Sequence, residues 1–225
     1  MARLGVSTKS LTWRLRGGKI DVQKTAMSRP PYFALDLAAQ GMLPNGWAEK
    51  VLEATSAPER IVVQTGVELQ PGDEQFSILE GAAVRARLPW LWDLYLGPLR
   101  SFASDRFSMP LFVSNRISSA ITLNILDGAG AGQAWHVDSN TATGVFFATG
   151  HEGEAGALEF QQPDGDIIRI HPRAGMFVCM AKPILHRVVP LDAPGMRLSL
   201  AMLYYDSPTD QPFANASDRH EMSPS

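Results

Sequence analysis

Short runs of apolar residues, separated by turns that contain Gly or Pro, dominate the chain from residue 117 onward. The runs are rich in β-branched and aromatic side chains, which is typical of strands. Short strands at this density indicate a sandwich or a barrel. The runs predicted as strands are 121–126, 143–148, 157–160, 166–170, 176–179, 184–189 and 196–205.

The preceding part of the chain has a helical pattern instead. From residue 81 to about residue 103, apolar side chains recur at spacings of three and four, which predicts a helix or a pair of helices. Pro89 or Pro98 is the expected break, because proline disrupts the interior of a helix. Another helix is predicted over 47–54 and a strand over 61–67. The fold class is therefore mostly β with flanking helices.

The length of 225 residues and the hydrophobic content of 45% are sufficient for one sizeable core. We expect a single domain over residues 31–206. Its flank of helices and strands would occupy 31–116, and its strand-rich core 117–206. The residues after 206 are rich in Ser, Pro and Asp, and we expect a flexible tail over 207–225.

The N-terminal 30 residues differ from the rest in charge. Through residue 29 there are seven Lys or Arg and one Asp, a net charge of +6, whereas the remainder has 13 Lys or Arg against 22 Asp or Glu, a net charge of −9. We interpret residues 1–30 as a basic, solvated arm that folds back on the domain or stays mobile. An organelle-targeting peptide is the alternative, since such peptides are rich in Arg and poor in acidic residues.

Composition excludes several classes of protein. The net charge of −3 argues against a protein whose main surface binds nucleic acid or a membrane. No apolar run approaches the roughly 18 residues of a membrane span. The single cysteine, Cys179, excludes an intramolecular disulfide and lies in a run that predicts a buried strand. With no recognisable secretory signal, we expect a cytoplasmic protein, and a homodimer stays open.

The candidate chemistry centres on His136, Asp138 and His186. Successive side chains of an extended strand point to opposite faces, so His136 and Asp138 point the same way and can bind one ion. His186 lies in the predicted strand 184–189 and can supply a third ligand. Two histidines and a carboxylate on one side of a metal leave the other side open, as in the facial triad of Fe(II) oxygenases. A zinc site with three protein ligands is the main alternative.

Arg197 and Ser199 share one face of the predicted strand 196–205, while apolar side chains occupy the other face. An always-charged guanidinium beside a hydroxyl, on a strand that is otherwise apolar, favours the binding of a carboxylate. A zinc hydrolase has no general need for such an arginine.

These elements, in this order, resemble the superfamily of dioxygenases that depend on Fe(II) and 2-oxoglutarate. The shared pattern is His-x-Asp, a second His further along the chain, and then Arg-x-Ser. The glycine-rich segment 128–132 before His136, and Tyr204-Tyr205-Asp206 after Arg197, are similar to the prolyl-hydroxylase-like branch. The resemblance covers about residues 117–206 and implies a double-stranded β-helix core, also called a jelly-roll or cupin-like core.

The resemblance implies a role for each candidate. His136, Asp138 and His186 would bind Fe(II) and carry the catalysis, and Arg197 with Ser199 would bind the distal carboxylate of 2-oxoglutarate. The co-substrate and O2 would be converted to succinate and CO2, and the oxidant formed in the process would attack a C–H bond of the substrate.

Asn124 is a further candidate for contact with 2-oxoglutarate or substrate. It shares a strand face with Leu126, the position at which the family has a tyrosine beside the co-substrate. The alternative is that the Asn124 side chain satisfies a neighbouring backbone group. Leu126 and Gln133 both replace tyrosines of animal prolyl hydroxylases, and these differences argue against a peptidyl-proline substrate.

The expected activity is oxidation, by default hydroxylation, of a C–H bond in a small molecule such as an amino acid or a natural-product intermediate. Asp138 argues against halogenation, because related halogenases have a small residue there. Leu203 stands where nucleic-acid demethylases usually have a further arginine. The alternatives are hydroxylation of a protein side chain, hydrolysis by zinc, and a non-catalytic barrel that binds a metal or an organic acid.

Overall fold

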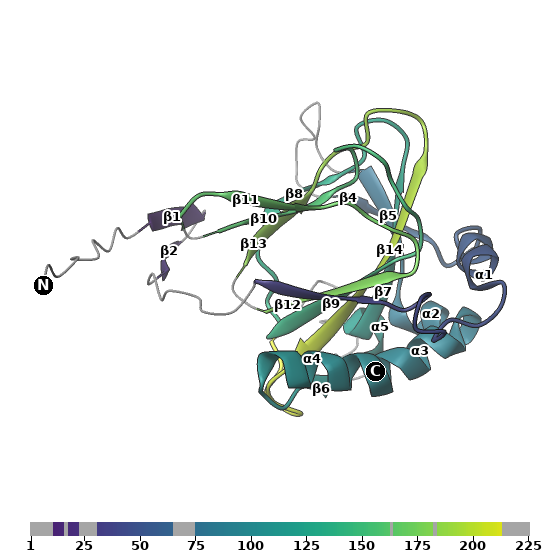
Figure 1. Ribbon diagram of the computed structural model, residues 1–225, viewed down its shortest axis with the longest axis horizontal. Helices are drawn as coiled ribbons and strands as arrows, with labels where there is room; N and C mark the ends of the chain where they lie inside the picture. Colours follow the sequence, from purple (N-terminus) through teal and green to yellow (C-terminus); the bar gives the residue numbers. More distant parts are fainter. Residues whose placement is uncertain are drawn as a thin grey trace, which may run out of the picture.

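Two antiparallel sheets face each other across the interior of the protein (Figure 1). The computed structural model describes residues 11–15, 18–22, 31–64, 75–162, 164–181 and 184–212. The smaller sheet has the strand order β11-β10-β13-β8, and the larger sheet has the order β3-β12-β9-β14-β7-β5-β4. The fold is therefore mostly β, with the two facing sheets of a double-stranded β-helix, which confirms the predicted fold class.

The smaller sheet brings the two candidate histidine ligands together. Pairing of β13 with β8 places His186 opposite His136, and pairing of β10 with β13 places Phe160 on the other side of His186. The strands of this sheet are β8 (Gln133–His136), β10 (Leu158–Gln161), β11 (Ile167–Ile170) and β13 (Leu185–Val188).

The larger sheet is built around one long strand, β14, which pairs with β7 on one side and with β9 on the other. A short strand, β6, also pairs with the end of β14. The strands of this sheet are β3 (Tyr32–Asp36), β4 (Ile61–Gln64), β5 (Gln75–Leu79), β6 (Phe112–Val113), β7 (Ile121–Asp127), β9 (Ala142–Phe147), β12 (Met176–Ala181) and β14 (Met196–Tyr205).

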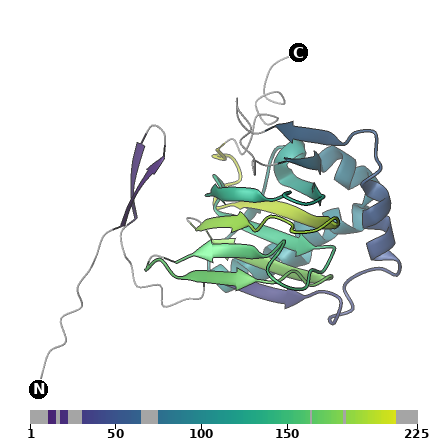
Figure 2. The same ribbon diagram turned by 90° about the horizontal axis from the view of Figure 1, so that it is seen from above.

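Helices cover the outer face of the larger sheet, as both ribbon views show (Figures 1 and 2). Trp90 of α3 packs edge-on against Phe146 of β9, with 6.3 Å between the ring centroids. No helix in the described part of the chain has the length and apolar character needed to cross a membrane. The helical segments are α1 (Trp47–Ala54), α2 (Gly81–Arg87), α3 (Pro89–Leu94), the π-helical turn η1 (Tyr95–Leu99), α4 (Arg100–Phe107) and α5 (Ile117–Ala120).

Alternation along β14 separates the helical layer from the interior between the sheets. One set of side chains belongs to the apolar core beneath the helices: Leu198, Leu200, Met202 and Tyr204. The other set lines the cavity between the sheets: Arg197, Ser199, Ala201 and Leu203. This alternation is the period of two that the sequence predicted for residues 196–205.

Most predicted elements are present, and the differences have local causes. The predicted helical region is broken at Leu88, before Pro89, and Pro98 lies inside the π-helical turn, where the ordinary helical hydrogen bonding is already interrupted. The prediction that His136 and Asp138 share a strand is wrong, because β8 ends at His136. The strand predicted over 61–67 is seen as β4, and residues 65–67 lie outside the described residues.

The predicted arm and tail are described only in part. Strands β1 (Leu11–Leu15) and β2 (Gly18–Val22) of the arm pair with each other, and its other residues through 30 lie outside the described residues. At the other end, the Gln211 side chain accepts a hydrogen bond of 2.8 Å from the backbone N–H of Asn115. Arg116 donates to the carbonyl oxygen of Gln211 at 3.1 Å. Residues 213–225 lie outside the described residues.

Cys179 lies in the middle of β12 and is fully buried, as the sequence predicted. Burial raises the pKa of its thiol to about 12. A thiol with this pKa is protonated at neutral pH and is a poor nucleophile, so Cys179 serves the core as a small apolar residue.

Gly81 offers a test of how α2 packs against the start of the core. A Cβ at this position would overlap the backbone carbonyl oxygen of Ile117, which cannot move without displacing α5. We therefore expect Gly81→Ala to lower the free energy of unfolding by roughly 1–3 kcal/mol, measured by urea denaturation. Gly97→Ala is the matched control, because a Cβ there would meet no atom within 4 Å outside its chain neighbours and the backbone of its own helical turn. An unchanged unfolding midpoint for Gly81→Ala would contradict this packing.

Candidate active site

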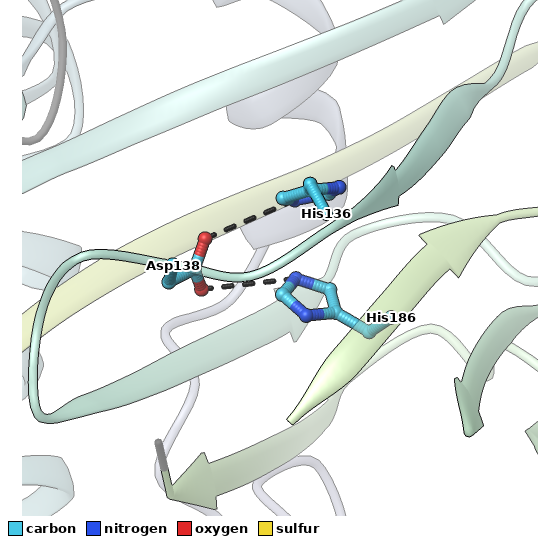
Figure 3. A group of neighbouring side chains, drawn as sticks. All are labelled: His136, Asp138 and His186. Atoms are coloured by element: carbon cyan, nitrogen blue, oxygen red, sulfur yellow. Dashed lines mark ion pairs between the residues drawn. The ribbon is translucent and has the colours of Figure 1, made fainter. Parts of the chain in front are cut away.

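His136, Asp138 and His186 form one group whose ligand atoms all lie within 4.8 Å of one another (Figure 3). His136 is the last residue of β8, and the pairing of β8 with β13 brings its ring to 4.2 Å from that of His186, between centroids. Asp138 follows in the loop after β8. Its carboxylate oxygens lie 3.8 Å from Nε2 of His136 and 3.7 Å from Nε2 of His186. Strand pairing and one loop thus bring the three predicted ligands together.

Backbone carbonyl groups set the orientation of both imidazoles. Nδ1 of His136 lies 2.7 Å from the carbonyl oxygen of Ala134, and Nδ1 of His186 lies 3.1 Å from that of Ile184. A carbonyl oxygen only accepts hydrogen bonds, so each Nδ1 carries a proton, which leaves Nε2 as the nitrogen through which each ring can bind a metal. Histidines that bind a metal through Nε2 are held in this way.

Asp138 is held by two buried polar side chains that belong neither to β8 nor to β13. Thr143, in β9, donates a short hydrogen bond from its hydroxyl to the Asp138 carboxylate. Asn140 donates to the Thr143 hydroxyl at 2.9 Å and to the carbonyl oxygen of Ala142 at 2.6 Å. Because the Thr143 oxygen accepts from Asn140, its own proton is available to the carboxylate. This chain orients Asp138 toward the two imidazoles.

The donor set fits a divalent cation. Two imidazole nitrogens and a carboxylate converge closely enough to bind one divalent cation together. Burial lowers the pKa of His186, so its imidazole is neutral at pH 7, as a metal ligand must be. Two histidines and one carboxylate with an open side form the donor set of mononuclear non-haem iron sites.

Arg197, in β14 of the larger sheet, is a fully buried cation that lines the interior between the sheets. Its Nε donates to the carbonyl oxygen of Gly156 at 2.7 Å, and a terminal nitrogen donates to the hydroxyl of Ser199 at 2.9 Å. The guanidinium carbon lies 5.3 Å from the centre of the Phe147 ring. Within the described ranges no carboxylate offsets this charge, and burial lowers the pKa of Arg197 to about 9. A bound carboxylate would compensate the charge.

A cavity of about 370 Å³ between the sheets connects the triad to Arg197. Its volume falls within the range of roughly 300–1,000 Å³ that is typical of small-ligand sites. All the site residues predicted from the sequence line it: His136, Asp138, His186, Arg197, Ser199 and Asn124. Pairing of β7 with β14 places Asn124 opposite Ser199, and within the described residues the Asn124 side chain has no backbone partner.

Thr143 is the contact that sequence reasoning missed. A threonine at the start of a predicted strand is ordinary, because β-branched residues are common in strands. Its hydrogen bond to Asp138 depends on the loop after β8 passing beside the first residues of β9. No local pattern in the sequence indicates that proximity.

Comparison with known proteins identifies the fold. No family model matches the sequence, and no curated protein matches it. Solved structures do match. The carbocyclase SnoK from nogalamycin biosynthesis, a non-haem alpha-ketoglutarate-dependent protein, superposes with a TM-score of 0.61 and 17% sequence identity. The match covers 86% of this chain and 87% of that chain.

Two further structures show what this fold contains in other proteins. The epimerase SnoN, solved with Fe3+, alpha-ketoglutarate and nogalamycin RO, matches with a TM-score of 0.60 and 15% identity over 79% of this chain and 80% of that chain. A prolyl hydroxylase from Trichoplax adhaerens, solved with a peptide fragment of hypoxia inducible factor, also has a TM-score of 0.60 and 15% identity. That match covers 86% of this chain and 88% of the other.

The chain therefore has the fold of the 2-oxoglutarate and Fe(II)-dependent oxygenases, as the resemblance predicted. It also has a two-histidine, one-carboxylate group at the centre of that fold. The similar structures include prolyl hydroxylases, an epimerase and a carbocyclase. Assignment to the prolyl-hydroxylase-like branch thus stays a prediction.

Thr143 allows the support of Asp138 to be tested. Thr143→Val keeps the shape of the side chain but removes the donor to the carboxylate and the acceptor for Asn140. We expect affinity for Fe(II) to fall about 10- to 100-fold, measured by anaerobic titration, because the carboxylate is no longer held in its binding orientation. Thr143→Ser retains the hydroxyl and should stay near the wild type. Equal affinities for Thr143→Val and Thr143→Ser would contradict the role of this hydrogen bond.

Proposed function

We propose that the chain is an Fe(II)- and 2-oxoglutarate-dependent oxygenase that hydroxylates a C–H bond of a small molecule. One observation carries the proposal. A buried guanidinium with no acidic partner in the described part of the chain lines the same cavity as an open group of two histidines and a carboxylate. A metal with a dicarboxylate co-substrate satisfies both features at once. The SnoN structure, which contains Fe3+ and alpha-ketoglutarate, supports this choice.

In this proposal the residues have separate tasks. His136, Asp138 and His186 would hold Fe(II) from one side, and Arg197 with Ser199 would bind the far carboxylate of 2-oxoglutarate. Bound iron, co-substrate and O2 supply the oxidising power, with succinate and CO2 as by-products. The protein positions these groups and excludes water. Little water reaches a guanidinium buried this deeply, so its attraction for a carboxylate is stronger than at a surface.

Zinc hydrolysis is the less favourable function for this site. A hydrolase needs a general base beside the metal-bound water. Among the described residues that line the cavity, Asp138 is the only carboxylate, and it is one of the three candidate ligands. The hydrolase hypothesis also assigns no function to Arg197, although burying a guanidinium without a counter-charge costs folding free energy.

The cavity supports a small-molecule substrate. Its volume of about 370 Å³ must contain both the co-substrate and the reacting part of the substrate. The prolyl hydroxylase among the similar structures was solved with a peptide, so hydroxylation of a protein side chain is the competing assignment. The presence of an epimerase and a carbocyclase on the same fold means that hydroxylation is proposed here as the simplest outcome of C–H oxidation.

Anaerobic titration with Fe(II), followed by 2-oxoglutarate, tests the proposal directly. We expect a weak visible absorption band when the co-substrate chelates the metal, and release of succinate after air is admitted. Tight binding of zinc without any effect of 2-oxoglutarate would favour the hydrolase. Binding of the metal and 2-oxoglutarate without succinate would favour a non-catalytic barrel.

Arg197→Met tests whether the buried guanidinium of Arg197 binds a carboxylate of 2-oxoglutarate. We expect affinity for 2-oxoglutarate to fall about 30-fold or more, since a buried charge pair is lost. In a thermal-shift assay, 2-oxoglutarate should stabilise the wild type and have little effect on the variant. Without ligand, the variant should lose no more than about 1 kcal/mol of unfolding free energy, because an uncompensated buried charge is removed along with its hydrogen bonds.

Arg173→Met is the matched control for this substitution. The Arg173 side chain is 68% exposed and lies 3.8 Å from the carboxylate of Asp36, away from the cavity residues. Its replacement should leave the response to 2-oxoglutarate unchanged. If Arg197→Met responds to 2-oxoglutarate as strongly as Arg173→Met does, the assignment of Arg197 is wrong.

A further inference from the structure

The cavity has a second polar region beyond the residues assigned to the co-substrate. Along β14 the cavity side chains follow in the order Arg197, Ser199, Ala201 and Leu203. Pairing of β7 with β14 places Asn124 opposite Ser199 and Thr122 opposite Ala201. Thr122 is therefore four strand positions from the level of Arg197, about 13 Å along the strand. A short dicarboxylate held by Arg197 and Ser199 lies at one end, and Thr122 lies toward the other.

Two hydroxyl groups in this second region have no partner in the described part of the chain. Ser119, in α5, lines the cavity and is only 1% exposed, and its Oγ has no hydrogen-bond partner among the described residues. Thr122 also lines the cavity, and its hydroxyl makes no hydrogen bond to another described residue. Buried hydroxyl groups are normally hydrogen-bonded. One buried hydroxyl without a partner and one partly exposed hydroxyl in the same cavity wall point to a ligand that hydrogen-bonds to both.

Charge is distributed unevenly along the cavity. Among the described residues that line it, the charged or metal-ligating side chains are those already assigned to Fe(II) and 2-oxoglutarate. Near Thr122 the wall consists of neutral hydroxyl groups and of the apolar side chain of Ala201; Leu203 lies beyond it, opposite Thr143, which holds the Asp138 carboxylate of the metal site. With Asp138 engaged by Fe(II), an ammonium or carboxylate group of a substrate would lose its hydration there without gaining a partner of opposite charge. A hydroxyl or carbonyl group would find hydrogen-bonding partners.

We propose that Ser119 and Thr122 form the substrate-binding site and that they select an uncharged molecule whose apolar skeleton carries a hydroxyl or carbonyl oxygen. The proposal rests on the proposed oxygenase function and narrows it. A free amino acid, which the sequence left open, carries both an ammonium and a carboxylate and does not suit this wall. The two hydroxyl groups bind the substrate oxygen and thereby determine which C–H bond faces the metal.

Four probes with one carbon skeleton test this selection. They are tetralin, which has no polar group, 2-tetralone, which has a carbonyl, and the charged compounds 2-aminotetralin and tetralin-2-carboxylate. Binding is measured by calorimetry on the protein loaded with Zn(II) and 2-oxoglutarate, which cannot turn over. We expect 2-tetralone to bind about five- to tenfold more tightly than tetralin, as one or two hydrogen bonds provide. Both charged probes should bind more weakly than 2-tetralone.

Single variants then assign the effect to the two hydroxyl groups. Ser119→Ala and Thr122→Val should each reduce the preference for 2-tetralone over tetralin, while Thr122→Ser should retain it. The affinity for 2-oxoglutarate, measured separately, should be little changed in all three variants. Loss of 2-oxoglutarate affinity in Ser119→Ala or Thr122→Val would place these residues in the co-substrate site and overturn the proposal.

Two outcomes with the wild-type protein are also decisive. Tightest binding of a charged probe, or equal binding of all four, would overturn the assignment of an uncharged substrate. Failure of the wild type to bind 2-oxoglutarate would instead refute the proposed oxygenase function. The second result is distinguishable from the first, because 2-oxoglutarate binding is measured before any probe is added.

Discussion

The alternation of side chains along β14 is the constraint on which the rest of the structure depends. Leu198 and Leu200 face the helical layer and help to form the main apolar core, so the strand cannot shift by one residue without exposing them. The same constraint places Arg197 and Ser199 in the interior between the sheets. Burial of one face thus determines the position of the functional groups on the other face.

The buried guanidinium shows how the fold prepares a binding site before any ligand is present. Gly156 and Ser199 each accept one hydrogen bond from Arg197, which fixes the direction of the side chain. Neither of them neutralises its charge, and the described residues contain no carboxylate that does. An interior cation without a counter-charge lowers the stability of the fold, and a bound dicarboxylate removes this cost. The missing counter-charge is therefore the origin of both the affinity and the selectivity for such a ligand. The metal site is also oriented by the protein itself: Thr143 orients the Asp138 carboxylate, and backbone carbonyl groups orient the two imidazoles.

Much of the site was predictable because its signals are local or ordered along the chain. The His-x-Asp pair and the Arg-x-Ser pair are each visible within a few residues, and their order indicated the superfamily. The strands were predictable for the same reason, with 196–205 matching β14 residue for residue. The reasoning for Asp138 was partly wrong, since this residue reaches the two histidines from a loop after β8 and not from a strand.

The sequence by itself determined the class of chemistry: two imidazoles, one carboxylate, and a guanidinium beside a hydroxyl on an apolar strand. Residue types and short spacings suffice for that inference. Only the tertiary structure decided which distant groups share the cavity. The contact of Thr143 with Asp138, and the position of Ser119 and Thr122 on the wall beyond Ser199, depend on strand pairing and on the packing of α5. Such contacts join residues whose separation along the chain carries no periodic signal, because they are set by how the sheets close and not by local conformation.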